Sequence, residues 1–349
     1  MAIRVGILTS GGDCPGLNAT LRGVAKALYH RMGDKVEIVG IMNGYDGLIN
    51  GNYREMSPDE FSGILTVGGT ILGTKRTPFK KMRVVEDDKV DKVAAMKKNY
   101  RAAKLDCLLC LGGNGTHKTA NLLSQEGLNI IGLPKTIDND LNGTDHCPGF
   151  ASAAKFIATT CMEVHRDAHV YDTGMVTVIE IMGRHAGWLA GSAALATWAG
   201  FGPDLVYLPE VDFDMSKFIS DVKEIYSKTG KCMVAVSEGI HYSDGSFVSE
   251  AKTSATDGFG HAQLGGLAVM LADVIKKETG AKVRGIELSL LQRCGSHVAS
   301  KTDIDEAYLA GKSAVEAAVS GYTDKMVAFQ CSRDSGYKCE IALQPLDIV

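Results

Sequence analysis

The sequence predicts an α/β protein of two lobes, each built on a mostly parallel, doubly wound sheet. Short apolar runs alternate with longer helical stretches, which is the pattern of strand–helix–strand units. This alternation occurs once before about residue 145 and again after it. The chain of 349 residues is also long enough for about two domains with a core each. Because pockets form preferentially between domains, we expect the active site in the cleft between the lobes.

The first half contains four apolar runs that predict strands and two stretches that predict helices. The expected strands are 3–9, 36–42, 106–111 and 129–133, and the expected helices follow the first strand up to His30 and occupy 116–125. Glycine-rich turns follow the first and third strands, as expected where a parallel strand passes into a helix.

The second half repeats this organisation without a fixed-period repeat. We expect strands at 175–181, 205–208, 232–236 and 282–288, and helices at 149–168, 186–198, 215–227 and 257–278. We assign residues 1–145 and about 292–325 to a donor-binding lobe. The other lobe comprises about 146–291 and the C-terminal segment 326–349.

Two loops predict an anion site at the carboxyl edge of the first sheet. Gly112-Gly113-Asn114-Gly115-Thr116 follows one strand and Ser10-Gly11-Gly12 follows another. Peptide N–H groups at a helix start attract phosphate, and glycines let the phosphate approach closely. Taken alone, Gly112 to Gly115 has the alternative interpretation of a tight strand-to-helix turn. Neither matches a dinucleotide fingerprint or a Walker loop.

A third loop carries the groups that phosphoryl transfer requires. Lys135, Thr136, Asp138 and Asp140 follow the strand 129–133 and offer an ammonium, a hydroxyl and two carboxylates. Transfer of a phosphoryl group needs charge neutralisation and a base for the attacking hydroxyl. The alternative interpretation is a capped, solvated turn.

Basic residues elsewhere predict further contacts to phosphate. Gly68 to Thr77 is a glycine-rich basic segment that can bring Arg76 onto a polyphosphate, unless it is only a surface loop. Arg184, Glu238, Arg284 and Arg293 fall at or near predicted strand ends. As a set they can hold a sugar phosphate, although single arginines in such places are more often surface ion pairs.

Composition limits the alternatives. The net charge of −4 provides no general field for nucleic acid or anionic lipid, and no apolar run reaches the roughly 18 residues of a membrane span. We therefore expect a cytoplasmic protein with no nucleic-acid or membrane partner. The 9 cysteines are scattered through apolar segments and predict reduced thiols, including Cys107 and Cys110 within a strand. The 9 histidines show no metal-ligand spacing.

With these motifs in order along nearly the whole chain, the sequence resembles the phosphofructokinase family. The resemblance rests on Leu8–Asn18, Gly68–Arg76, Gly112–Thr116, Pro134–Asp140, Glu180–Arg184, Ser237–Gly239 and Gln292-Arg293. It implies two Rossmann-like lobes, a homodimer or homotetramer, allosteric control in glycolysis, and phosphoryl transfer to the 1-hydroxyl of fructose 6-phosphate.

The resemblance also implies residue roles. Asp138 matches the catalytic base, and Thr136, Asp140, Lys135 and Arg184 complete the catalytic set. Donor contacts match Gly11, Gly12, Arg76, Gly113, Asn114, Gly115 and Thr116. Sugar-phosphate contacts match Thr136, Asp138, Met182, Gly183, Arg184, Glu238, Arg284 and Arg293. The implied cofactor is Mg²⁺, held by Asp138, Asp140 and, less effectively, Asn114.

Three positions depart from the family pattern. Asn114 replaces an aspartate that helps hold the metal, and a neutral amide is a weaker ligand. Met175 and Leu290 replace an arginine and a histidine that contact the 6-phosphate in many bacterial ATP-dependent members. The substrate phosphate then depends more on other groups.

The phosphoryl donor depends on two positions. Pyrophosphate-using relatives typically carry aspartate at the position of Gly115 and lysine at that of Lys135, whereas classical bacterial ATP users carry glycine at both. Gly115 leaves room for an α-phosphate, so we expect ATP, with pyrophosphate as the alternative. A non-catalytic sugar-phosphate-binding protein is a third hypothesis, motivated by Asn114.

Overall fold

The computed structural model describes residues 2–86, 89–249 and 266–349. Contacts divide the chain into two compact units, and the first comprises Met1–Ser152 with Ala299–Val349 while the second comprises Ala153–Val298. Both units have α/β architecture, as predicted. No helix in the described part is long and apolar enough to cross a membrane.

The first unit is built on a seven-stranded sheet in the order β11-β10-β5-β4-β1-β2-β3. Its strands are β1 (Ile3–Thr9), β2 (Val36–Ile41), β3 (Tyr53–Met56), β4 (Cys107–Gly112), β5 (Ile130–Pro134), β10 (Lys325–Ser332) and β11 (Lys338–Pro345). The central strands β5, β4, β1 and β2 are parallel neighbours, and only β3 and β11 run antiparallel to their partners. The four strands predicted in this half are confirmed to within two residues.

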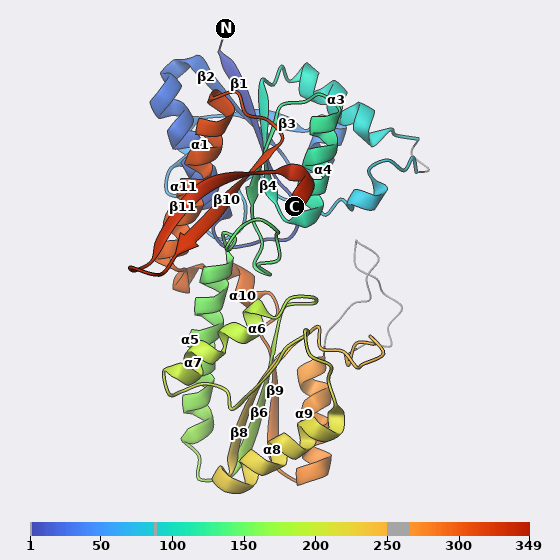
Figure 1. Cartoon of the computed structure of the whole chain (residues 1–349), viewed down its shortest axis with the longest axis vertical. Helices are drawn as coiled ribbons and strands as arrows, with labels where there is room; N and C mark the ends of the chain where they lie inside the picture. Colours follow the sequence, from blue (N-terminus) through green and yellow to red (C-terminus); the bar gives the residue numbers. More distant parts are fainter. Residues whose placement is uncertain (1, 87–88, 250–265) are drawn as a thin grey trace. The chain divides into compact units, whose positions relative to one another are not determined.

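Helices cover both faces of this sheet (Figure 1). They are α1 (Leu17–Met32), α2 (Tyr45–Asn50), α3 (Lys92–Ala102), α4 (Asn114–Gln125) and α11 (Lys301–Val319). The helices α1 and α11 pack directly on each other, with glycine at both contacts. A Cβ on Gly23 would lie 2.1 Å from the carbonyl oxygen of Tyr308, and one on Gly311 would lie 2.2 Å from that of Thr20. Glycine is therefore required for the two helices to approach so closely.

The segment 326–349 corrects the predicted lobe boundaries. The sequence analysis assigns it to the sugar-phosphate lobe, but its strands β10 and β11 extend the sheet of the first unit. Lys325 and Met326 pair in parallel with Ile131 and Gly132 of β5. The second boundary also moves, because the first unit resumes at Ala299. An apolar run indicates a strand but does not indicate which sheet the strand joins.

The second unit contains a parallel four-stranded sheet in the order β7-β8-β6-β9. Its strands are β6 (Met175–Ile181), β7 (Leu205–Tyr207), β8 (Lys231–Ser237) and β9 (Lys282–Glu287), and its helices include α8 (Met215–Thr229), α9 (Leu267–Thr279) and α10 (Leu291–Cys294). The apolar faces of α8 and α9 form a core with this sheet, in which Phe218 and Leu271 are fully buried.

Two helix predictions in this half differ from the structure. The expected helix 186–198 is divided into α6 (Trp188–Ser192) and α7 (Ala194–Trp198). The division follows from a tight turn, because the N–H of Ala193 donates to the carbonyl of Ala190 at 3.1 Å. Of the expected helix 257–278, the part 257–265 lies outside the described residues. The helix α5 (Phe150–His169) confirms the expectation for 149–168.

A buried carboxyl group ties the start of α11 to the start of α5. Asp303 is 1% exposed, and its carboxylate accepts hydrogen bonds from the N–H of Gly149 at 2.8 Å and from the hydroxyl of Ser152. Burial raises the pKa of Asp303 to about 6, against the hydrogen bonds that lower it. The folded protein therefore keeps this proton to a higher pH than the unfolded chain does.

We expect Asp303 to make folding stability fall with rising pH between about 4 and 6. The unfolded-state pKa is about 3.9, so the contribution is complete below that value and lost as the pH passes through the folded-state value. Urea unfolding of the wild type and of Asp303→Asn should be compared at both ends of this range. The wild type should lose up to about 3 kcal/mol relative to the variant as the pH rises. A constant difference between the two proteins would contradict this assignment.

Candidate active site

Three neighbouring parallel strands of the first unit end at one edge of its sheet. Thr9 of β1 pairs with Leu111 of β4, and Gly112 of β4 pairs with Pro134 of β5. The N–H of Ser10 donates to the carbonyl of Leu111 at 2.9 Å. The loops after these strands therefore lie side by side, as predicted, at the edge where open α/β sheets bind ligands.

The glycine-rich loop after β4 leads directly into α4. The helix begins at Asn114, two residues before the predicted start, and its N-cap Gly113 provides no side-chain cap. A Cβ on Gly112 would lie 2.2 Å from the hydroxyl oxygen of Thr116, so this position requires glycine. Asn114 and Gly115 are exposed in the first helical turn, where peptide dipoles favour an anion. The loop therefore has the backbone geometry of a phosphate site.

Lys135 joins the glycine loops to the acidic loop. It is 5% exposed, and its Nζ donates to the carbonyl of Gly12 at 2.6 Å. Burial lowers the pKa of Lys135, whereas the charges of Asp13 and Asp138 raise it and that of Arg76 lowers it. These charges act on Lys135 because the loop after β1, the acidic loop after β5 and the basic segment 68–77 converge here. The convergence places two carboxylates and two cations around the same edge of the sheet.

The acidic loop after β5 is held by its own side chains. The hydroxyl of Thr136 accepts from the N–H of Asp138 at 3.1 Å. Asn139 adopts a left-handed conformation with φ 56°, and its Oδ1 accepts from the N–H of Cys147 at 2.9 Å. Asp138 is half-buried and Asp140 is exposed. A carboxylate is therefore positioned on a fixed turn beside the glycine loop.

The basic segment, residues 68–77, packs on the end of β1, the loop after it and the start of α1. The hydroxyl of Thr74 donates to the carbonyl of Gly11 at 2.6 Å, and the hydroxyl of Thr9 donates to the carbonyl of Gly73 at 2.9 Å. The amide of Asn18 donates to the carbonyl of Gly69 at 2.6 Å. These contacts place Arg76 near Lys135, and the side chain of Arg76 is exposed.

Two residues of this edge were not singled out from the sequence. Asp13 has a buried carboxylate oxygen with no hydrogen-bond partner in the part of the chain that the structure describes. His117 is fully buried, and its Nδ1 lies 2.9 Å from the carbonyl oxygen of Gly113. Burial lowers the pKa of His117 to about 4, so the ring is neutral at pH 7 and donates from Nδ1. Its spacing of four residues from the N-cap glycine is a signal that sequence reasoning can use.

The second unit brings another group of predicted residues together. Glu238 directly follows β8, and its carboxylate accepts from the N–H of Gly183 at 3.3 Å. Gly183 has φ 132° and lies so close to Ala186 that a Cβ would approach its carbonyl oxygen to 2.5 Å. The N–H of Met182 donates to the side chain of Gln292 at 3.2 Å. The buried Gln292, which the sequence analysis quotes only as part of a motif, thus positions the loop after β6.

Burial controls the charge of Glu238. Burial raises the pKa of this carboxyl group, and the negative charge of Glu287 also raises this pKa. The hydrogen bond from the N–H of Gly183 and the guanidinium of Arg184 lower the pKa. Arg184 and Glu238 therefore interact as a partly buried pair of opposite charge. Such a pair suits a polar ligand that carries both hydroxyl and anionic groups.

Two predicted arginines differ in their placement. Arg293 is half-buried in α10, next to Gln292 and just after β9, so it lies near the carboxyl edge of the sheet. Arg284 is exposed within β9 and pairs with Thr177, three residues before the last residue of the strand. The structure does not bring Arg284 to that edge within this unit, because the strand begins only two residues before it.

Comparisons with known proteins agree with one another. The family model described as Phosphofructokinase matches residues 4–318. An ATP-dependent 6-phosphofructokinase of Spirochaeta thermophila is 44% identical over 330 residues, which cover 93% of this chain and 87% of the relative. A pyrophosphate–fructose 6-phosphate 1-phosphotransferase of Xanthomonas campestris is 38% identical over 349 residues, with 97% and 82% coverage.

A solved structure has the same fold. The crystal structure of a pyrophosphate-dependent phosphofructokinase from Marinobacter aquaeolei superposes with a TM-score of 0.85 at 28% identity, covering 99% of this chain and 83% of that one.

Two α/β units with a glycine-rich anion loop beside an acidic loop define an α/β phosphotransferase with an alcohol acceptor. The chain belongs to the phosphofructokinase family, whose members transfer a phosphoryl group to fructose 6-phosphate. The family assignment made from the motifs is confirmed.

Proposed function

We propose that this protein is an ATP-dependent 6-phosphofructokinase that converts fructose 6-phosphate to fructose 1,6-bisphosphate. The observation that carries the choice of donor is the open space at Gly115. A Cβ built on this residue meets nothing within 4 Å, and the residue is exposed in the first turn of α4. Within residues 2–86, 89–249 and 266–349, the space next to Gly115 is therefore open, which leaves room for a nucleotide. The 44% identical relative from Spirochaeta thermophila is named as ATP-dependent.

In this proposal the first unit performs the chemistry. Asp138 removes the proton of the attacking 1-hydroxyl, while Thr136, which accepts from the N–H of Asp138, fixes the turn that presents this carboxylate. Lys135 and Arg76 offset the negative charge of the transferring phosphoryl group. The backbone of Gly11, Gly12 and Gly113 to Thr116 binds the donor. Asp140 orients the sugar.

The side chains at this edge of the sheet offer ligands that suit Mg²⁺, because hard cations prefer carboxylate oxygens. The exposed Asp140 and half-buried Asp138 are suitable ligands, and one carboxylate oxygen of Asp13, near Lys135, has no hydrogen-bond partner among the described residues. Asn114 contributes a neutral oxygen at most. When bound with the donor, the ion would neutralise phosphate charge.

The second unit binds the sugar phosphate in this proposal. Glu238 accepts hydrogen bonds from sugar hydroxyls, and Met182, Gly183 and Arg184 contact the substrate from the loop after β6. Arg293 contributes positive charge near this edge, while Arg284 lies elsewhere on β9. The raised pKa of Glu238 then affects substrate affinity.

We expect Glu238→Gln to raise the KM for fructose 6-phosphate about 10-fold or more with a smaller effect on kcat. A charge-assisted hydrogen bond contributes about 1.5 to 3 kcal/mol. In the wild type KM should also rise on acidification, beginning at a higher pH than an ordinary glutamate would cause, because protonation removes the acceptor. The variant should lack this dependence. Glu224→Gln, on the exposed surface of α8, is the matched control, and an unchanged KM in Glu238→Gln would refute the role.

Pyrophosphate is the second candidate donor. Lys135 donates to the carbonyl of Gly12, a residue of the proposed donor site, and relatives named for pyrophosphate are 36–38% identical to this chain. Initial rates with each donor, at saturating fructose 6-phosphate and excess Mg²⁺, separate the two. Efficient turnover with pyrophosphate and little with ATP would overturn our choice. Failure with both donors would contradict the proposed function as a whole.

A further inference from the structure

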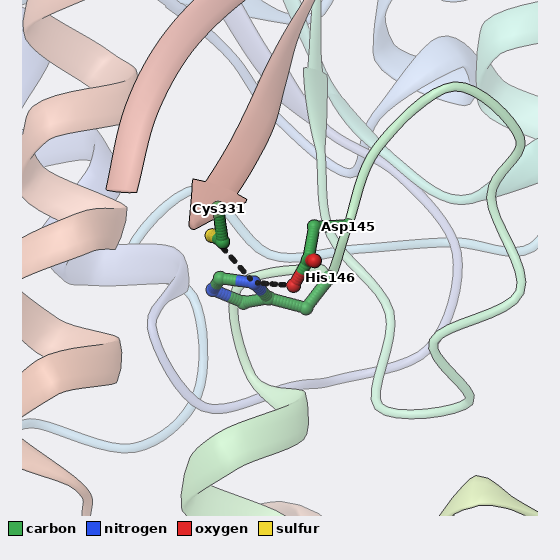
Figure 2. A group of neighbouring side chains, drawn as sticks. All are labelled: Asp145, His146 and Cys331. Atoms are coloured by element: carbon green, nitrogen blue, oxygen red, sulfur yellow. Dashed lines mark hydrogen bonds and ion pairs between the residues drawn. The ribbon is translucent and has the colours of Figure 1, made fainter. Parts of the chain in front are cut away.

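Three potential metal ligands of the first unit converge at a place that the proposed phosphoryl-transfer chemistry does not use. Asp145 and His146 lie between β5 and α5, and Cys331 is near the end of β10 (Figure 2). One ligand atom from each residue lies within 4.8 Å of the others. The Nδ1 of His146 is 3.1 Å from the Oδ1 of Asp145 and 3.7 Å from the Sγ of Cys331.

The two separations from the Nδ1 of His146 are close to those of ligands on one tetrahedral ion, while the ligand atoms of Asp145 and Cys331 lie within 4.8 Å of each other. Zinc binds histidine nitrogen and carboxylate oxygen at about 2.0–2.2 Å and thiolate sulfur at about 2.3 Å. Ligands at tetrahedral angles and these bond lengths are separated by about 3.3 to 3.7 Å. The mixed nitrogen, oxygen and sulfur donors favour Zn²⁺ over Mg²⁺ or Ca²⁺, which prefer oxygen ligands alone.

His146 is already oriented as a metal ligand. Its Nε2 lies 2.7 Å from the Oε2 of Glu306, and its ring stacks on Phe329 with centroids 4.8 Å apart. The other carboxylate oxygen of Glu306 accepts from the hydroxyl of Tyr337. A carboxylate that accepts the Nε2 proton leaves the Nδ1 lone pair facing Asp145 and Cys331. Carboxylate–histidine pairs commonly support zinc in this way.

Backbone hydrogen bonds hold the two ligand-bearing segments together. The N–H of Asp145 donates to the carbonyl of Phe329 at 2.9 Å, and the N–H of Phe329 donates to the hydroxyl of Thr144 at 2.9 Å. The ligands from the loop and from β10 are thus brought together before an ion binds. The side chains of His146 and Asp145 are 11% and 25% exposed, so an ion can reach them from solvent.

A fourth ligand is available from the neighbouring strand. Cys339 of β11 is the direct antiparallel partner of Cys331. Directly opposite residues of an antiparallel pair project to the same face of the ribbon, with Cβ atoms about 4.5–5.5 Å apart. Both cysteines are free thiols. The thiol of Cys339 is therefore within reach of the open coordination position.

Arg333 competes with the ion for Asp145. Its guanidinium donates to both carboxylate oxygens of Asp145, at 3.0 and 2.9 Å. A carboxylate has about four lone-pair sites, so Oδ1 can still coordinate an ion while Oδ2 keeps the arginine. The pairing nevertheless weakens the negative charge available to a cation.

We propose that Asp145, His146 and Cys331 form a Zn²⁺ site, with Cys339 as the fourth ligand. The site lies a few residues after the acidic loop and fixes the segment 144–146 to the β10–β11 hairpin. The ion would thus stabilise the first unit without taking part in phosphoryl transfer.

The test uses the full-length protein, stripped of metal and fully reduced in oxygen-free buffer. Calorimetric titration with Zn²⁺ should give one ion per chain, and Co²⁺ should give the absorption of a tetrahedral ion with thiolate charge-transfer bands. Zn²⁺ should also raise the Tm, because a ligand that binds only the folded state stabilises it. A wild type with no stoichiometric binding, or a Co²⁺ spectrum without thiolate bands, would overturn the proposal.

Variants then identify the ligands. Cys331→Ser should abolish the charge-transfer bands or reduce them to those of one thiolate, while Cys294→Ser, which removes an exposed cysteine of the other unit, should leave binding unchanged. Glu306→Gln should raise the Kd for Zn²⁺ about 10- to 100-fold. Arg333→Ala should lower it, because the competing cation is gone. Equal binding in the wild type, Cys331→Ser and Arg333→Ala would refute this site even if zinc binds elsewhere.

Discussion

Replacing Asp138 by serine is expected to lower kcat by about 10²- to 10⁴-fold with a modest change in KM. The physical reason is the loss of the base that removes the proton from the attacking hydroxyl. The backbone of the acidic loop should survive, because the N–H of residue 138 still donates to Thr136 and Asn139 still accepts from Cys147. Steady-state kinetics with both substrates varied measures the two constants separately.

Two further variants make this result interpretable. Asp138→Asn keeps the size of the side chain and removes only the base, so it should lose as much kcat as the serine variant. Asp34→Ser, an exposed aspartate in the short 3₁₀ helix before β2, should behave as wild type. Near-normal kcat in Asp138→Asn, in a protein with unchanged circular dichroism, would disprove the assigned role.

Replacing Gly115 by aspartate is expected to lower kcat/KM for ATP about 10²-fold while use of pyrophosphate is retained or improved. A carboxylate at the start of α4 would repel the α-phosphate of ATP, and placing like charges together costs several kcal/mol. The substitution fits the fold, since a Cβ at this position meets nothing within 4 Å and the backbone conformation is ordinary. The measurement is kcat/KM for both donors at fixed fructose 6-phosphate.

The controls separate charge from bulk. Gly115→Ala adds volume without charge and should keep most ATP activity. Gly191→Asp adds the same charge at an equally open glycine in the other unit and should change neither donor. Equal loss with both donors in Gly115→Asp would show that the position supports catalysis generally and does not select the donor.

The elements of the fold follow largely from local sequence. β1 and β6 have the bounds that their apolar runs predict, and β4 and β5 differ by one residue at each end. These strands are largely buried on both faces, so their sequences are mostly apolar and easy to recognise. The interruption between α6 and α7 was not recognisable, because alanine-rich sequence favours a continuous helix and the break depends on a local turn.

The candidate site was predictable to the extent that its residues follow strands. Parallel strands end at a common edge, so the sequence by itself predicts that Gly113 and Asp138 lie near each other. The contacts that tune the site were not predictable. The ammonium of Lys135 on the carbonyl of Gly12 joins residues 123 positions apart.

The sequence alone determined the family, the strand-following loops and the types of chemical group that they carry, because these properties depend on residues close together in the chain. The tertiary structure alone decided that β10 and β11 complete the first sheet and that Asp145 and His146 face Cys331, more than 180 residues further along. The physical reason is that strand pairing depends on which hydrogen-bonding edges meet in space. A local pattern of apolar and polar residues does not contain that information.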